Sequence, residues 1–166
     1  DQLRLLQRDA EVIRMDDDLH VCPLSSRFPT WSMVHSHPMD LSLIIPCHNE
    51  AGNIHPFAKR VLECMGEADA PQTLELIFVD DGSSDGTFAK VLQLIEGGLS
   101  PRISVEGIEL SRNFGKEAAM LAGLEHAQGS MVGFIDANLQ QDPAISFQMF
   151  AYLAAHPQTD CVAAVQ

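Results

Sequence analysis

The feature that most constrains the fold is an alternation of short apolar runs with segments whose apolar residues recur every three or four positions. The apolar runs, rich in β-branched residues, occupy residues 41–46, 74–79, 103–110, 131–135 and 161–165. Between them, the helical period predicts helices over residues 54–65, 88–95, 118–127 and 145–153. Such alternation is typical of a parallel sheet with helices on both faces. The sequence therefore predicts an α/β fold with a mostly parallel sheet.

Residues 1–39 lack this pattern. They contain an acidic run at residues 16–18, prolines at positions 23, 29 and 38, and no period of 2 or 3.6 through residues 21–38. Apolar residues from Leu3 to Ile13 are compatible with a short helix. We interpret residues 1–39 as a flexible or non-native N-terminal extension, with an ordered strap as the alternative, and residues 41–166 as the domain. Because the last predicted strand has no covering helix after it, we expect a sheet truncated at its C-terminus.

Charge and cysteine spacing exclude several classes of function. Ten Lys and Arg residues stand against 23 Asp and Glu residues, a net charge of −13. A surface of this sign repels nucleic acid and anionic lipid, so neither is an expected partner. The four cysteines have no CxxC spacing, so the sequence signals neither a zinc site nor a disulfide framework. No apolar run approaches the roughly 18 residues that span a bilayer. We expect reduced thiols and a cytoplasmic location.

Four polar segments follow the predicted strands. In an open parallel sheet, ligands bind outside the carboxyl ends of the strands. That rule selects residues 47–53, 80–87, 111–116 and 136–143, which should converge on one rim of the sheet. The sequence has no GxxxxGK[ST], GxGxxG or HExxH motif, so the signatures of a P-loop kinase, a dinucleotide dehydrogenase and a zincin are missing.

Two of these segments carry candidate ligand contacts. Asp80 and Asp81 are adjacent carboxylates at a strand end. Two adjacent negative charges destabilise the fold unless a base, a ribose hydroxyl or a cation binds to them. Asp136, Asn138 and Gln140 would lie on one side of an extended stretch. Three oxygen ligands suit Mg²⁺ or Mn²⁺ shared with a substrate phosphate. The sequence therefore predicts a divalent cation on the rim.

The third segment adds positive charge to this acidic rim. Arg112 and Lys116 are two of the six basic residues that follow Met39. A cation beside the carboxylates could neutralise a diphosphate, and the alternative is an ordinary helix N-terminus with surface charge. We take Lys116 as a candidate diphosphate contact.

Four motifs in order resemble the family 2 glycosyltransferases, and most closely the polyprenyl-phosphate branch with dolichyl-phosphate mannose synthases and bactoprenol glucosyltransferases. The motifs are IIPCHNE (44–50), VDDGSSDGT (79–87), LSRNFGKEAA (110–119) and IDANLQ (135–140). The resemblance implies a GT-A, Rossmann-like fold, of which this chain is the nucleotide-sugar-binding half. It implies nucleotide-sugar contacts at Pro46, Glu50, Asp80 and Asp81. It also implies a metal site at Asp136, Asn138 and Gln140, with Asp136 and Asn138 as the catalytic residues.

The activity implied by the resemblance is inverting transfer of a sugar from a UDP- or GDP-linked donor to undecaprenyl or dolichyl phosphate, with Mg²⁺ or Mn²⁺. Family members usually have Asp where this chain has Asn138, so we expect weaker metal binding. They also continue into an acceptor-side region, so we expect this chain alone to be inactive and the full-length protein to lie at the cytoplasmic face of a membrane. Homo-oligomerisation stays open. The alternative function is a non-catalytic nucleotide-sugar-binding fragment with a weakened metal site.

Overall fold

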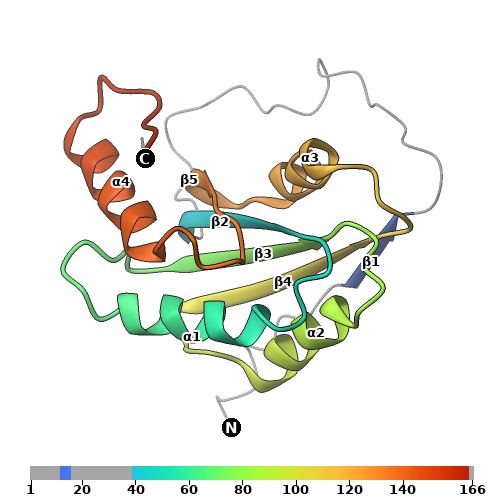
Figure 1. Ribbon diagram of the computed structural model, residues 1–166. Helices are drawn as coiled ribbons and strands as arrows, with labels where there is room; N and C mark the ends of the chain where they lie inside the picture. Colours follow the sequence, from blue (N-terminus) through green and yellow to red (C-terminus); the bar gives the residue numbers. More distant parts are fainter. Residues whose placement is uncertain (1–11, 16–38, 165–166) are drawn as a thin grey trace, which may run out of the picture.

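The computed structural model describes residues 12–15 and 39–164, and its centre is a five-stranded sheet in the order β1-β4-β3-β2-β5 (Figure 1). Every pairing between neighbouring strands is parallel. The strands are β1 (Val12–Met15), β2 (Met39–Cys47), β3 (Leu74–Asp80), β4 (Ile103–Leu110) and β5 (Gly129–Phe134). The helices are α1 (Ile54–Cys64), α2 (Thr87–Gly97), α3 (Lys116–His126) and α4 (Pro143–Ala155). The α/β fold predicted from the sequence is confirmed.

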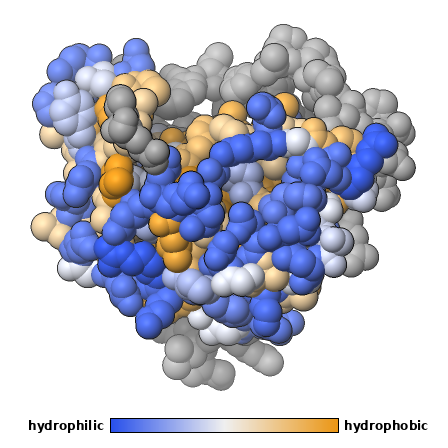
Figure 2. Space-filling model, in the orientation of Figure 1, coloured by the Kyte–Doolittle hydropathy of each residue, from blue (hydrophilic) through white to orange (hydrophobic). Residues whose placement is uncertain are grey.

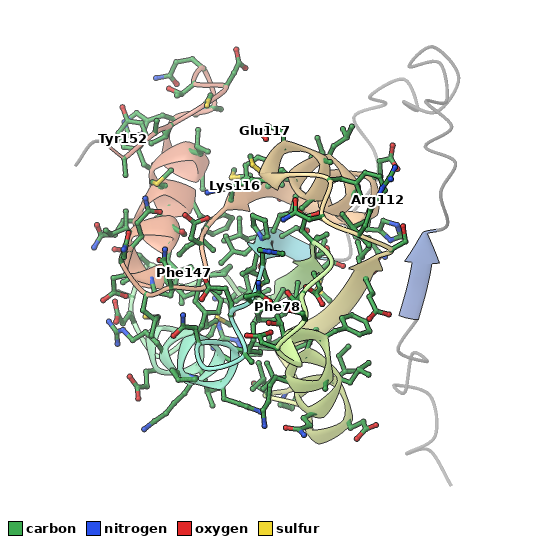
Figure 3. All side chains as sticks on the ribbon, turned by 45° about the vertical axis from the view of Figure 1, so that its right-hand side comes forward. Phe78, Arg112, Lys116, Glu117, Phe147 and Tyr152 are labelled. Atoms are coloured by element: carbon green, nitrogen blue, oxygen red, sulfur yellow. The ribbon has the colours of Figure 1, made fainter. Side chains whose placement is uncertain are left out.

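Helices cover both faces of the sheet. Figure 1 shows α1 and α2 on one face, α3 on the other, and α4 beside α1 near the β5 edge. β3 is buried along its whole length and is largely apolar, as expected of a central parallel strand that is covered on both faces. Phe78 of β3 packs edge-to-face on Phe57 of α1, with ring centroids 6.0 Å apart. Phe147 brings α4 into the same core; Phe78 and Phe147 are labelled in Figure 3.

The four predicted helices and four of the five predicted strands are present within a few residues of their expected bounds. The strand expected over residues 161–165 is wrong, because residues 161–164 are irregular. A strand needs a hydrogen-bonded neighbour, and an apolar run without one has no ladder to join.

Val12 and Ile13, two of the apolar residues that are compatible with a short helix, belong to a strand. Val12–Met15 is instead β1, which pairs with β4 in the register Val12 to Gly107. The physical reason is that pairing with a sheet edge overrides a local apolar pattern in residues such as Val12 and Ile13, which favour strands. Residues 1–11 and 16–38, on which most of the predicted extension falls, lie outside the described residues.

The α3 side of the β5 edge carries exposed apolar side chains. Val132 and Phe134 of β5 are 38% and 44% exposed, and Leu121 and Leu124 of α3 lie on the same side of the molecule. Figure 2 shows hydrophobic residues gathered over this region, above a largely hydrophilic front. Among the helices that the structure describes, none combines the length and hydrophobicity needed to cross a bilayer.

Candidate functional site

The four polar segments meet at the carboxyl ends of the strands, where they line a cavity of about 290 Å³. The lining comes from residues 46–48 and 50, Asp81, Asn113, residues 115–116 and residues 136–138. A second hollow of about 190 Å³ shares Pro46, Lys116 and Asp136 with the first. The convergence expected from the parallel topology is therefore present, and every segment contributes at least one polar group.

Asp81 fastens two of these segments together. Its Oδ1 accepts a hydrogen bond from the Phe114 backbone N–H at 2.7 Å, and its Oδ2 accepts one from Gly115 at 2.9 Å. Its own N–H donates to the Cys47 carbonyl at 2.8 Å, which ties the end of β3 to the end of β2. Asp81 is 4% exposed and still lines the cavity. Backbone donors therefore stabilise this carboxylate without any ligand.

Asp80 turns away from the cavity. Its Oδ1 accepts hydrogen bonds from the Ser83 backbone N–H at 3.1 Å and from the Ser83 hydroxyl, and the residue is 2% exposed. It is not among the residues that line the cavity. The adjacent carboxylates thus lie in different surroundings, and the expected contact between Asp80 and a nucleotide finds no support in this geometry.

Glu50 and Pro46 reach the cavity as the sequence motif predicts. The Glu50 backbone N–H donates to Thr87 Oγ1 at 2.8 Å, and its carboxylate accepts a hydrogen bond from the Asn53 side chain. These bonds hold the loop after β2 against the start of α2. Pro46, near the end of β2, lines both the main cavity and the second hollow, so the first motif contributes to both.

His48 and Asn113 also line the cavity, although sequence reasoning did not single them out. His48 Nδ1 lies 2.8 Å from the Asp81 carbonyl, which can only accept, so Nδ1 carries the hydrogen. Nε2 is then an acceptor, and it lies 3.3 Å from Nδ2 of Asn113. Both residues stand inside the motifs that carry the family resemblance, which is the signal that could have identified them.

The segment after β5 is turned rather than extended. Asn138 Oδ1 accepts a hydrogen bond from the Gln140 backbone N–H at 3.0 Å, and Leu139 has φ 58°. A side-chain carbonyl that bonds a backbone N–H two residues on closes a tight turn. The expected extended geometry is therefore wrong. Asp136 and Asn138 line the cavity, whereas Gln140 is exposed and does not.

The far end of this segment is anchored at the start of α4. Asp142 caps the helix by accepting from the Ala144 backbone N–H at 3.0 Å. Arg60 of α1 donates to both Asp142 oxygens, from Nη2 at 2.8 Å and from Nε at 3.2 Å. These hydrogen bonds, with Arg60 the larger contributor, lower the pKa of Asp142. The turn that carries Asp136 and Asn138 is thus held between β5 and a capped helix.

Cys47 lines the cavity as a neutral thiol. Its side chain is buried, and Sγ lies 3.3 Å from the Ile45 carbonyl. Burial raises the pKa of Cys47 well above its ordinary value, and the negative charges of Asp80, Glu50 and Asp136 raise it further. A thiol held protonated is a poor nucleophile and a poor metal ligand at neutral pH.

The oxygen atoms of the cavity fit a cation that is shared with a phosphate. In the part of the chain that the structure describes, no group of three or more His, Cys, Asp and Glu side chains could hold a metal ion by itself. Asp136 and Asn138 supply oxygen ligands to one cavity. Mg²⁺ is usually held by one or two carboxylates together with substrate phosphates and waters. This donor set therefore suits Mg²⁺ or Mn²⁺ that arrives with a diphosphate.

Comparison with known proteins identifies the family. The family profile described as "Glycosyl transferase family 2" matches residues 42–166. The chain belongs to glycosyl transferase family 2. The resemblance recognised in the four motifs is confirmed, and every residue that lines the main cavity belongs to one of these motifs.

Relatives in this glycosyl transferase family include enzymes named for polyprenyl phosphates. The dodecaprenyl-phosphate galacturonate synthase of Rhizobium johnstonii is 41% identical over 106 residues, which cover 63% of this chain and 30% of that protein. The bactoprenol glucosyl transferase of Shigella phage SfV is 40% identical over 105 residues, covering 63% and 32%.

A solved structure supports the same fold. The mannosyltransferase PcManGT from Pyrobaculum calidifontis, in complex with GDP-Man and Mn²⁺, superposes with a TM-score of 0.55 at 29% identity. The match covers 72% of this chain and 33% of that protein. The chain therefore spans about a third of the length of the relatives that it matches.

Proposed function

We propose that this chain binds a nucleoside diphosphate sugar in the 290 Å³ cavity, together with Mg²⁺ or Mn²⁺, and that the whole protein transfers the sugar to a polyprenyl phosphate with inversion. The observation that carries the proposal is the convergence of all four family motifs on one cavity at the carboxyl ends of β2, β3, β4 and β5. The solved relative bound to GDP-Man and Mn²⁺ supports the same ligand class.

Within the cavity we assign two ends by their chemistry. Glu50, Asp81 and Asn113 offer hydrogen-bonding groups for the base and ribose. Lys116, Asp136 and Asn138 carry the charge and oxygen ligands that a diphosphate and its cation need. The assignment of Asp136 and Asn138 as the catalytic residues rests on this position.

The proposed reaction forms a bond between an acceptor phosphate oxygen and the anomeric carbon, while the bond from that carbon to the diphosphate breaks and its electron pair leaves on the diphosphate. A bound divalent cation supplies charge stabilisation to that leaving group. A phosphate acceptor is already ionised at neutral pH, so the cavity needs no strong general base. The names of the curated relatives support a polyprenyl phosphate as acceptor. Because that lipid is anchored in a bilayer, we place the whole protein at the cytoplasmic face of a membrane.

Titration calorimetry with GDP- and UDP-linked sugars, with and without Mn²⁺, tests donor binding by this chain. We expect binding that depends on Mn²⁺ and a preference for one base. Asp136→Asn should weaken binding by roughly tenfold or more, because it removes a charged cation ligand. Asp69→Asn is the matched control, since Asp69 is an exposed carboxylate in the α1–β3 loop, outside the cavity lining. Absence of binding for every donor would refute the proposal.

A second function is favoured by one observation, the amide at Asn138 where a carboxylate would add a negative charge to the cation site. If donor binding does not depend on Mn²⁺, the chain is a non-catalytic nucleotide-sugar-binding module. Sugar transfer to a polyprenyl phosphate in the presence of Mn²⁺ would exclude that function and would also contradict the expected inactivity of this chain alone.

A further inference from the structure

Lys116 and Asp136 form an ion pair across the cavity. The Lys116 ammonium lies 2.6 Å from Asp136 Oδ1, and both residues line the main cavity and the second hollow. The pair joins the first residue of α3 to the segment that follows β5; Lys116 is labelled at the start of α3 in Figure 3. The two side chains are 56% and 39% exposed, so the contact can open to solvent without repacking the core.

The same carboxylate is the charged cation ligand of the proposed site. Beside Asp136, the residues of the cavity lining that can supply a carboxylate are Glu50 and Asp81. Asp81 already accepts two backbone hydrogen bonds, and Glu50 accepts one from Asn53. An ammonium held at hydrogen-bond distance from Asp136 Oδ1 therefore competes with a divalent cation for this carboxylate, because two cations on one carboxylate repel each other.

The charge of the lining gives Lys116 a second use. Three carboxylates, those of Glu50, Asp81 and Asp136, face a single ammonium, that of Lys116, in the cavity lining. Such a lining repels a nucleoside diphosphate unless positive charge is directed at it. Lysine carries its charge on a flexible four-carbon stem, so it can move from a carboxylate to a nearby phosphate.

We propose that Lys116 exchanges partners. In the ligand-free protein it neutralises Asp136 in place of a divalent cation. When the cation and the nucleoside diphosphate are bound, Lys116 leaves Asp136 and pairs with the diphosphate. The inference rests on the proposed function. Lys116 then competes with the divalent cation for Asp136 when no nucleotide is bound, and it stabilises the nucleoside diphosphate when the cation is bound.

The exchange predicts opposite effects of one substitution. Lys116→Met removes the ammonium and keeps the apolar stem. Affinity for Mn²⁺ alone, measured from the electron paramagnetic resonance signal of free Mn²⁺, should rise by about tenfold, because Asp136 is no longer neutralised. Affinity for GDP or UDP at saturating Mn²⁺, measured by calorimetry, should fall by about tenfold, because the diphosphate loses a charged partner. A purely structural role for Lys116 would weaken both.

Two controls isolate the mechanism. Lys90→Met removes the same charge from a half-buried position on α2, outside the cavity lining, where Nζ contacts Gln93 at 3.3 Å, and should leave both affinities unchanged. In an Asp136→Asn background, Lys116→Met should no longer raise Mn²⁺ affinity, because the contested carboxylate is gone. Circular dichroism of each variant checks that the fold is retained.

The outcomes separate this inference from the proposed function. If wild-type protein binds GDP or UDP with Mn²⁺ but Lys116→Met shifts both affinities in one direction or leaves either unchanged, the exchange is refuted and the proposed function stands. If no nucleotide binds, the proposed function fails, and the Mn²⁺ titrations alone decide whether Lys116 competes with a cation. If neither the wild type nor the Lys116→Met variant binds Mn²⁺ at millimolar concentration, the exchange is refuted.

Discussion

Gly82 marks a close approach between two of the segments that build the cavity. A Cβ at this position would lie 2.4 Å from the Arg112 carbonyl carbon and 2.6 Å from the Asn113 nitrogen. These are backbone atoms, so no side-chain rotation can relieve the overlap. Gly82 also has φ 64°, a left-handed conformation that L residues rarely adopt. Gly82→Ala should therefore both strain the turn after β3 and push away residues 112–113.

The magnitude can be worked from a matched glycine. Gly86 has φ 85°, and a Cβ there would meet no atom within 4 Å, so Gly86→Ala carries only the left-handed cost, about 1 kcal/mol. Gly82→Ala carries the same cost and must also widen a 2.4 Å approach to at least 3.4 Å, a shift of about 1 Å. Overpacking of this kind costs about 1–3 kcal/mol, which brings the expected loss to about 2–4 kcal/mol.

Urea denaturation followed by circular dichroism measures both losses. The Gly82 variant should lose about 1–3 kcal/mol more free energy of unfolding than the Gly86 variant. It should also bind GDP- or UDP-sugars more weakly, because the moved segment carries the N–H groups of Phe114 and Gly115 that hold Asp81. Equal losses for the two variants would refute the reasoning that a backbone contact, rather than left-handed strain, makes Gly82 necessary.

Three further predictions follow from the site. Asn138→Asp should tighten Mn²⁺ binding because it restores a charged ligand; unchanged binding by calorimetry would contradict this. With Cys22 replaced by Ser, native protein at pH 8 should be alkylated at exposed Cys161 and not at Cys47, because burial raises the pKa of the Cys47 thiol. Equal labelling of the two residues in mass spectrometry would show that Cys47 is accessible and reactive, contrary to this prediction. Hydrogen bonds from Arg60 and Ala144 lower the pKa of Asp142 in the folded protein. The ionised carboxylate therefore stabilises the fold above about pH 4, the ordinary pKa of Asp in the unfolded chain. This stabilisation is lost as the pH falls through the lowered pKa of the folded protein. Asp142→Ala should cost about 1 kcal/mol at pH 7 and less at pH 3; a loss that does not vary with pH in urea titrations would count against the cap.

The sequence predicted the order of elements from Met39 to Ala155 because strand and helix periods are local properties of the chain. It did not predict the outcome where a local pattern depends on a distant partner. Val12 and Ile13 join β4 as a strand, and the apolar residues 161–164 stay irregular. Both outcomes depend on which sheet edge is within reach, and neither can be read from the residues themselves.

The candidate site likewise combines features that the sequence predicts with features that depend on contacts between distant segments. Parallel topology, inferred from the apolar pattern, was enough to predict that segments 47–53, 80–87, 111–116 and 136–143 would share one rim. It could not distinguish Asp80 from Asp81, which are neighbours in the chain and differ in the groups that donate hydrogen bonds to them and in whether they line the cavity. It also placed Gln140 beside Asp136, because it assumed an extended backbone where Asn138 closes a turn.

By itself, the sequence determined the family, the alternation of strands and helices, and the places where polar and charged residues follow the carboxyl ends of the strands. Only the tertiary structure decided which of those residues face the cavity and which partners they meet there, including the pairing of Lys116 with Asp136. The physical reason is that the two kinds of information depend on interactions of different range along the chain. Hydrophobic periodicity acts along neighbouring residues, whereas hydrogen bonds and ion pairs depend on distances between segments that the fold alone brings together.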